Sequence, residues 1–211
     1  MESKILELIQ NLTNINSPSG NAYNAISYVK QKVEHLGYST QLTNKGALII
    51  TVEGEDNERQ RCITAHVDTL GAMVKEIKED GRLTIDLIGG FKYNAIEGEY
   101  CQIETDSGET YTGTICLHET SVHVYRENEK IPRDIEHMEV RIDEKTSSKK
   151  ETEDLGIEVG NFISFDPRTE ITSSGFIKSR HLDDKASVAM ILDLLERIKN
   201  EQIKLQIGRA H

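Results

Sequence analysis

The chain has 211 residues, which is enough for one large domain or two small ones with a hydrophobic core. Apolar residues make up 36% and charged residues 29%, as in folded globular proteins, which excludes a disordered or fibrous chain. A net charge of −11 disfavours nucleic acid and anionic membranes as partners and suits a cytoplasmic protein. There is no Trp, which excludes a carbohydrate groove lined with Trp. Three widely spaced cysteines, Cys62, Cys101 and Cys116, favour reduced thiols over a disulfide framework or a structural zinc site.

The first third of the chain mixes amphipathic helices with short strands. Its N-terminus is too polar for a signal peptide, and no apolar run approaches the length of about 18 residues that a membrane span needs. Apolar spacing predicts helices over 2–13 and 21–36, then two strands around a turn at 44–46, the second over 47–52. Residues 61–65 are expected to form a buried strand that ends at His66.

The middle of the chain is predicted to be β-rich. Alternating patterns flank Asp80-Gly81 and Ser107-Gly108, and both dipeptides are typical of hairpin turns. The expected strands are 73–78, 82–88, 99–105, 109–116, 122–125, 138–142 and 161–165. The charged stretch 143–154 is compatible with a short helix or with a solvated loop.

Helical spacing returns over 185–199, and 203–207 resembles the opening of another strand. This order predicts an α/β domain made of 1–71 and 166–211, with a small β domain, 72–165, inserted into it. The α/β sheet would be short of strands, so we expect a truncated piece, and whether 206–211 are native is left open.

Two motifs could carry chemistry. His66 and Asp68 are two apart on an extended segment and share a face, and a carboxylate commonly orients a metal-binding His. The alternative is a His at a strand end beside a turn Asp. Asp183 and Asp184 stand at a helix entry, where Asp serves as a cap or as a carboxylate that bridges two metals. His181 is expected on the polar surface.

The remaining patterns are interpreted as structural. No GxxxxGK[ST] motif is present, which excludes a phosphate loop of that type, and Ser187 lacks a nucleophile-elbow context. The other histidines are assigned structural positions: His35, His118, His123, His137 and His211.

Four blocks occur in an order that is more specific than either motif alone. They are AHVDTLGAMVKEI (65–77), DGRLTIDLIGG (80–90), GIEVGNFISFD (156–166) and RHLDDKASVAMILDLLERI (180–198). Together they resemble the dinuclear metallo-aminopeptidases called glutamyl, deblocking or tetrahedral aminopeptidases, some of which carry the label cellulase M. The resemblance implies a metallopeptidase-type α/β catalytic domain, incomplete here, with an inserted PDZ-like β-barrel that serves oligomerisation.

The resemblance also implies roles for single residues. His66 would be a metal ligand, Asp68 the catalytic-site Asp that orients it, Asp183 the carboxylate bridging two divalent ions (zinc or cobalt), and Asp184 a residue shaping that turn. The reaction implied is removal of N-terminal residues from peptides. The family also needs a Glu pair, a further acidic ligand and a distal His, which this sequence lacks. The 211-residue form is therefore expected to be inactive.

Two other functions remain open from the sequence. The β domain could act alone as a binding or assembly module without catalysis, or the chain could belong to a glycan hydrolase, as the cellulase label suggests. The expected partners are peptide substrates and further copies of the chain, which would associate through the inserted β domain.

Overall fold

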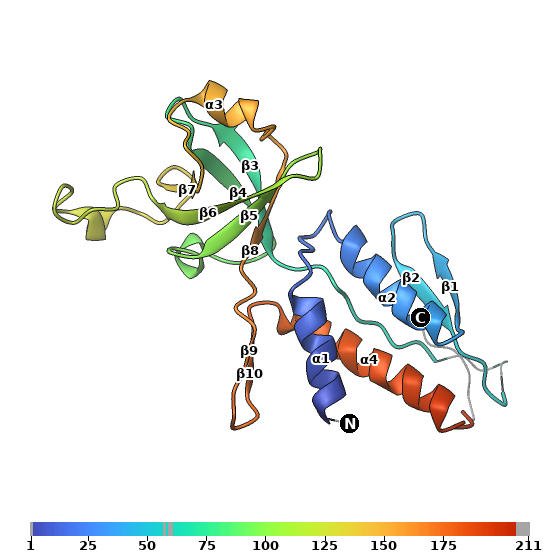
Figure 1. Ribbon diagram of the computed structural model, residues 1–211. Helices are drawn as coiled ribbons and strands as arrows, with labels where there is room; N and C mark the ends of the chain where they lie inside the picture. Colours follow the sequence, from blue (N-terminus) through green and yellow to red (C-terminus); the bar gives the residue numbers. More distant parts are fainter. Residues whose placement is uncertain (1, 57, 59–60, 206–211) are drawn as a thin grey trace. The chain divides into compact units, whose positions relative to one another are not determined.

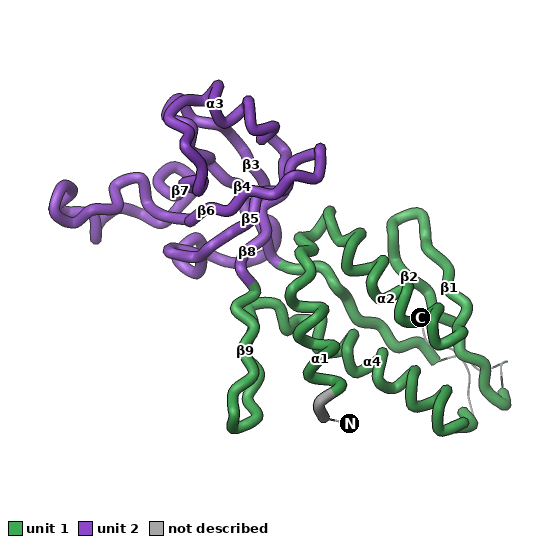
Figure 2. The backbone as a smooth tube through the Cα atoms, viewed as in Figure 1, with its two compact units in different colours: residues 1–69, 167–211 green, residues 70–166 purple. Residues whose placement is uncertain are grey.

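The computed structural model describes residues 2–56, 58 and 61–205. The chain divides into two compact units, which Figure 2 shows in different colours. Unit 1 comprises Met1–Thr69 and Pro167–His211, and unit 2 comprises Leu70–Asp166. None of the helices described in either unit is long and apolar enough to cross a membrane.

Unit 1 is built from helices and two small hairpins (Figure 1). Its elements are α1 (Glu2–Thr13), α2 (Tyr23–His35), β1 (Ser39–Leu42), β2 (Leu48–Thr51), β9 (Glu170–Ile171), β10 (Ile177–Lys178) and α4 (Leu182–Asn200). The β9–β10 hairpin was not expected from the sequence. The apolar faces of the three helices form one core, in which Leu12, Val33 and Ala189 are fully buried. The predicted helices and the β1–β2 hairpin are therefore confirmed.

The predicted strand over 61–65 is wrong. The backbone of this segment forms no strand ladder within the described part of the chain, and Ile63 is 48% exposed. An extended apolar segment becomes a strand only where a neighbour pairs with its backbone groups. Among the described residues the sheet of β1 and β2 has two strands, and neither pairs with this segment.

Unit 2 is a closed antiparallel barrel with the strand order β3-β4-β7-β6-β5-β8. The strands are β3 (Gly71–Ile77), β4 (Leu83–Ile88), β5 (Tyr100–Glu104), β6 (Thr110–Leu117), β7 (Met138–Ile142) and β8 (Phe162–Phe165). The unit also holds the 3-10 turns η1 (Tyr93–Ala95) and η2 (Asn128–Lys130) and the helix α3 (Lys149–Asp154). Closure pairs β8 with both β3 and β5, so no strand of the barrel is left as an open edge. This confirms the expected β-barrel.

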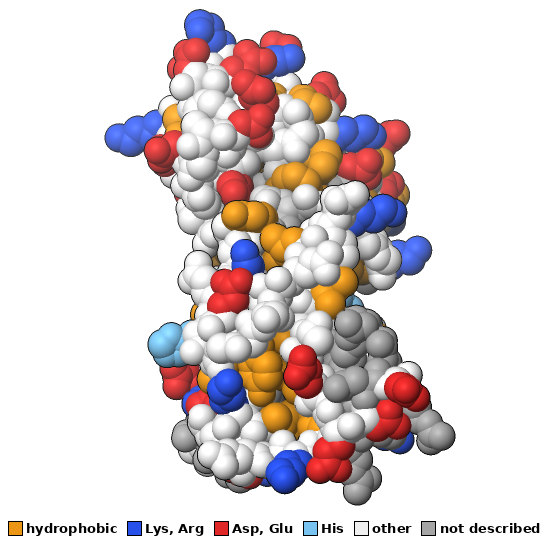
Figure 3. All heavy atoms as spheres, turned by 90° about the vertical axis from the view of Figure 1, so that its right-hand side faces the viewer, with side chains coloured by type: hydrophobic (Ala, Val, Ile, Leu, Met, Phe, Trp, Pro, Cys, Tyr) orange, Lys and Arg blue, Asp and Glu red, His pale blue; other side chains and the backbone are white. Residues whose placement is uncertain are grey.

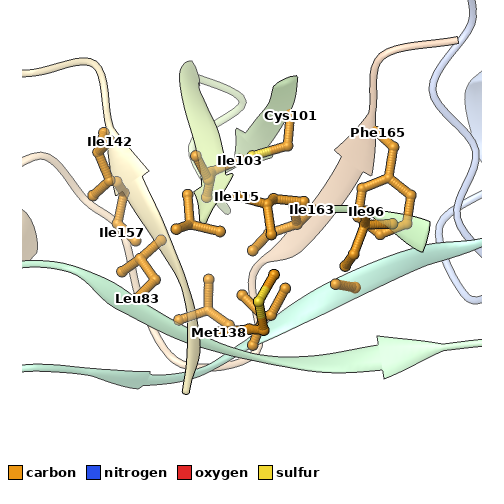
Figure 4. Packing of buried hydrophobic residues seen from close by; sticks show 14 of the residues in the cluster. Leu83, Ile96, Cys101, Ile103, Ile115, Met138, Ile142, Ile157, Ile163 and Phe165 are labelled. Atoms are coloured by element: carbon orange, nitrogen blue, oxygen red, sulfur yellow. The ribbon is translucent and has the colours of Figure 1, made fainter. Parts of the chain in front are cut away.

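The barrel interior is filled by aliphatic side chains that point inward from alternate strand positions (Figure 4). Leu83, Ile103, Ile115 and Ile163 are fully buried there. Phe165 closes one side and meets Phe91 edge to face, with ring centroids 5.7 Å apart. The period-two pattern in the sequence is thus the inward face of a packed barrel.

Three further segments depart from the sequence predictions or complete them. The predicted strand 122–125 is wrong, because the Ser121 carbonyl accepts from the amides of Val124 and Tyr125 and closes a turn. The open stretch 143–154 is a loop followed by α3, whose first turn is capped by the Ser148 hydroxyl. Residues 203–205 form no strand, and the rest of that predicted strand, like the question of 206–211, lies outside the described residues.

Candidate metal site

The segment that carries His66 and Asp68 is fastened to the loop after α1. The Thr69 amide donates to the Ser17 carbonyl at 2.8 Å, and the Ser19 amide donates to the Thr69 carbonyl at 3.2 Å. The Ser17 hydroxyl, which is fully buried, donates to the Val67 carbonyl at 2.7 Å. These bonds take the place of strand pairing and hold the segment against the loop after α1.

The imidazole of His66 lies between two carboxylates. Its Nδ1 is 3.2 Å from Oδ1 of Asp68, and its Nε2 is 3.3 Å from Oδ1 of Asp183. The Asp68 backbone carbonyl also lies 3.1 Å from Nδ1. The structure thus brings Asp183, which is distant in sequence, to His66 and Asp68.

His66 Nε2 and Asp183 Oδ1 lie 3.3 Å apart, within ion-pair distance. The Asp183 side chain is 94% exposed, so it reaches solvent. An imidazole nitrogen and a carboxylate oxygen are also donors that zinc and cobalt accept, so the two residues fit a divalent ion.

Asp183 projects from an irregular start of α4. Asp183 and Asp184 have non-helical dihedral angles inside the assigned helix, and the peptide bond between them is cis. The Asp183 carboxylate reaches His66 from this turn. Asp184 belongs to the same turn, but no ligand role is assigned to it.

Lys185 holds that turn from the buried side, and no role was predicted for it from the sequence. Its side chain is fully buried, and its ammonium donates to the carbonyls of Leu12 at 2.9 Å and Ile15 at 2.6 Å. Burial lowers the pKa of this ammonium to about 8. The bonds tie the beginning of α4 to the end of α1, where the last carbonyls of a helix lack partners. A charged residue within an apolar helix face was the available signal.

Two other expectations about polar residues can now be compared with their surroundings. His181 was expected on the surface, which is wrong, because it is 5% exposed and stands immediately before α4. No role was predicted for Ser19 from the sequence, whereas its hydroxyl donates to Oδ2 of Asp68. A serine in a turn gives no sequence signal for such a partner.

The candidate site holds fewer donors than a tight metal centre needs. Within 2–56, 58 and 61–205, no group of three or more His, Cys, Asp or Glu side chains is placed to hold one ion. Zinc sites in proteins use three or four protein ligands. His66 and Asp183 therefore make a partial site, with Asp68 behind the histidine.

A groove of about 540 Å³ lies beside the site within unit 1, and His66 and Asp68 contribute to its wall. The rest of the lining is mostly apolar and includes Ile26 of α2, Ile50 of β2 and Ile191 of α4. Figure 3 shows hydrophobic side chains reaching the surface of this unit on the face turned to the viewer. The groove explains why segment 61–65 is apolar in sequence although it is not a buried strand.

The chain is similar to several known proteins. The family model described as M42 glutamyl aminopeptidase matches residues 46–209. YhfE of Bacillus subtilis (strain 168) is 61% identical over 202 residues, which are 96% of this chain and 58% of that protein. The glutamyl aminopeptidase of Lactococcus lactis subsp. cremoris (strain MG1363) is 24% identical, over 97% of this chain and 58% of that protein.

The fold has a solved counterpart as well. The aminopeptidase APDkam598 from the archaeon Desulfurococcus kamchatkensis superposes with a TM-score of 0.85 at 26% identity, covering 98% of this chain and 55% of that one. The chain therefore spans somewhat more than half the length of the relatives it matches. With a family match over most of its residues, the chain belongs to the M42 glutamyl aminopeptidase family.

Proposed function

We propose that this chain supplies part of the active site of a metal-dependent aminopeptidase that removes N-terminal residues from peptides. The observation that carries the proposal is the placement of His66 Nε2 3.3 Å from Asp183 Oδ1, with Asp68 behind the ring. In this proposal His66 and Asp183 are ligands of divalent ions, zinc or cobalt, and Asp183 bridges two of them. The family membership and the named relatives support it.

Each residue has a defined task in the proposed reaction. When bound, the ions would supply Lewis acidity for the scissile carbonyl and lower the pKa of a water molecule. His66 presents its Nε2 lone pair, and Asp68 accepts from Nδ1 and holds the ring in that orientation. The exposed Asp183 carboxylate contributes negative charge where the cations bind. The donors that complete the site are proposed to lie in the part that the longer relatives have beyond the matched region.

A fusion would test the proposal. We would join this chain to the rest of YhfE, remove metal with a chelator, and measure release from aminoacyl p-nitroanilides with and without Zn²⁺ or Co²⁺. Release should return with metal and be lost in His66→Ala and Asp183→Asn. Asp68→Asn should cost about 10–100-fold, as for groups that orient a metal ligand.

Glu201→Gln is the matched control, since Glu201 is an exposed carboxylate that pairs with Arg197 at the end of α4. It should leave the metal-restored rate unchanged. Release that survives chelation, or that persists in His66→Ala, would overturn the metal role. The 211-residue chain alone is expected to show no release.

We also propose that unit 2 mediates association between copies of the chain. Its loop after β6 exposes apolar side chains, with Val122 59%, Val124 70% and Tyr125 41% exposed. The loop is held by its own bonds, including one from the Asn128 side chain to the Thr120 carbonyl. Exposed apolar residues on an ordered loop are typical of protein interfaces.

Light scattering after size exclusion would test this association. Val124→Asp should lower the mass of any oligomer, because it places a charge within the apolar contact. Val159→Asp is the matched control, since Val159 is 65% exposed elsewhere in unit 2. A mass that is unchanged in Val124→Asp, or lowered equally in both variants, would place the interface elsewhere.

A further inference from the structure

The carboxylate of Asp68 has a different partner on each oxygen. Oδ2 accepts a hydrogen bond from the Ser19 hydroxyl, whereas Oδ1 lies 3.2 Å from Nδ1 of His66. The Asp68 side chain is 43% exposed, so water competes for both oxygens. A carboxylate bonded through one oxygen only can rotate, but a partner on each oxygen fixes its plane. Ser19 therefore restricts the orientation of Asp68.

The neighbours of the His66 ring favour a proton on Nδ1. Nδ1 faces two acceptors of Asp68, the carboxylate and, at 3.1 Å, the backbone carbonyl. Nε2 faces one acceptor, the Asp183 carboxylate, which is 94% exposed and is therefore shared with water. The neutral ring thus favours the proton on Nδ1 and a lone pair on Nε2. This is the form in which imidazole binds a metal.

Ser19 is itself held in register with the site segment. Its amide donates to the Thr69 carbonyl at 3.2 Å, and Pro18 forms a parallel bridge to Thr69. The hydroxyl of Ser19 is thereby fixed next to Asp68 by backbone bonds. The neighbouring Ser17 hydroxyl points elsewhere and bonds the Val67 carbonyl at 2.7 Å.

We propose that Ser19 is a positioning residue that locks the Asp68 carboxylate and so keeps His66 in its Nδ1–H form, with Nε2 open to a divalent cation. The inference rests on the proposed function for the identity of that cation. It adds a residue that contacts neither the imidazole nor Asp183 in any described bond. It also gives the loop after α1 a role in the chemistry as well as in the packing.

The decisive experiment determines directly which nitrogen of the His66 ring is protonated, in the metal-free 211-residue chain. Two-bond ¹H–¹⁵N correlation spectra at alkaline pH report which ring nitrogen of a histidine is protonated, and His66→Ala assigns the signals. In the unmodified chain His66 should be the Nδ1–H tautomer. In Ser19→Ala the signals should shift toward a mixture with the Nε2–H tautomer, and Ser19→Thr should restore the original spectrum.

Ser17→Ala is the matched control, a second serine of the same loop whose hydroxyl does not touch the site side chains. It should lower the melting temperature and leave the His66 tautomer unchanged. If Ser19→Ala leaves the tautomer unchanged, or if Ser17→Ala shifts it equally, the positioning role is wrong.

A Co²⁺ titration followed through paramagnetic broadening of the His66 ring gives a second readout. Ser19→Ala should weaken the apparent affinity about tenfold, the lower end of the range for groups that orient a metal ligand, and Ser17→Ala should not. The two proposals can fail separately. A tautomer shift in Ser19→Ala without Co²⁺ binding at His66 supports the positioning role and counts against the metal role. An unchanged tautomer in Ser19→Ala, together with metal-restored release in the fusion, supports the metal role and counts against the positioning role.

Discussion

Glu139 is the buried charge with the most partners in unit 2. Its side chain is 2% exposed, and its carboxylate accepts from Lys78 at 2.7 Å and from the Arg82 guanidinium. The ring of His118 lies beside it, with Nδ1 3.1 Å from Oε2. Burial of the carboxylate raises its pKa, but hydrogen bonds from Lys78 and Arg82 outweigh this and hold the pKa below its ordinary value. His118 thus belongs to a cluster of charged side chains around a buried carboxylate.

The lowered pKa of Glu139 makes the stability of unit 2 depend on pH. In the unfolded chain this carboxyl titrates near its ordinary pKa of about 4.3. Above that pH both states are ionised and the stabilisation is complete. As the pH falls toward the lower folded pKa, the unfolded state takes up a proton first, so stability is lost.

Glu139→Gln should therefore lower the free energy of unfolding at neutral pH by about 1–3 kcal/mol, since Lys78 and Arg82 lose a charged partner. It should also flatten the loss of stability between pH 5 and 3, by about the amount that titration of one carboxyl contributes. Hydrogen exchange read by mass spectrometry on peptides of β3, β4 and β7 would measure both effects.

Asp154→Asn is the control for Glu139→Gln, because Asp154 is exposed and pairs with Lys150 within one helix. Exposed pairs of this kind contribute less than about 1 kcal/mol, so exchange in the barrel should not change. Equal effects of the two variants would contradict the assignment of the pH dependence to Glu139.

At the scale of elements, Gly113 of β6 marks the closest approach between two barrel strands. A Cβ atom there would lie 2.8 Å from Val140 Cγ1 and 2.9 Å from the Arg141 carbonyl oxygen. The carbonyl belongs to the paired strand β7 and cannot move without breaking the ladder. A missing side chain at this position lets β6 and β7 pair.

Gly113→Ala should destabilise the protein by about 1–3 kcal/mol, as overpacking does. Gly90→Ala is the matched control, since a Cβ at Gly90 would meet nothing within 4 Å. Thermal unfolding followed by circular dichroism would compare the two. A melting temperature for Gly113→Ala that equals that of Gly90→Ala would show that β6 can shift.

Two segments show that an apolar pattern in the sequence does not by itself predict a strand. Val122 and Val124 fit a strand pattern, yet the Ser121 carbonyl closes a turn there and leaves both side chains exposed. Segment 61–65 fits a buried strand, yet nothing described pairs with it. Alternation reports which side chains are apolar, whereas a strand also needs a partner backbone. The hairpins at Gly81 and Gly108 were predictable because both partners are local.

At the scale of the whole molecule, the ends of unit 2 lie next to each other. Ala72 near its start pairs with Ile163 near its end, across β3 and β8. A segment whose ends meet can be inserted into another domain without distorting either one. The boundaries predicted from the sequence lie after residues 71 and 165, and the two compact units of the structure meet after residues 69 and 166.

We expect residues 70–166 to fold when expressed alone, because the barrel is closed and has its own core. Circular dichroism should show a cooperative melt, and the amide spectrum should be dispersed. Leu83→Ala, which empties a fully buried position, should lower the melting temperature of this fragment and of the full chain. An isolated fragment that is unfolded would show that the barrel depends on unit 1.

The sequence by itself determined the helices, the local hairpins, the β-rich middle of the chain and the motifs around His66 and Asp183. These features depend on the period of apolar residues and on turn chemistry, which act over a few positions. Only the tertiary structure decided that Ser19 bonds Asp68, that Lys185 is buried under α1, and that Asp183 reaches His66. Each of these contacts joins residues from 49 to 173 positions apart, and local patterns carry no information about such pairs.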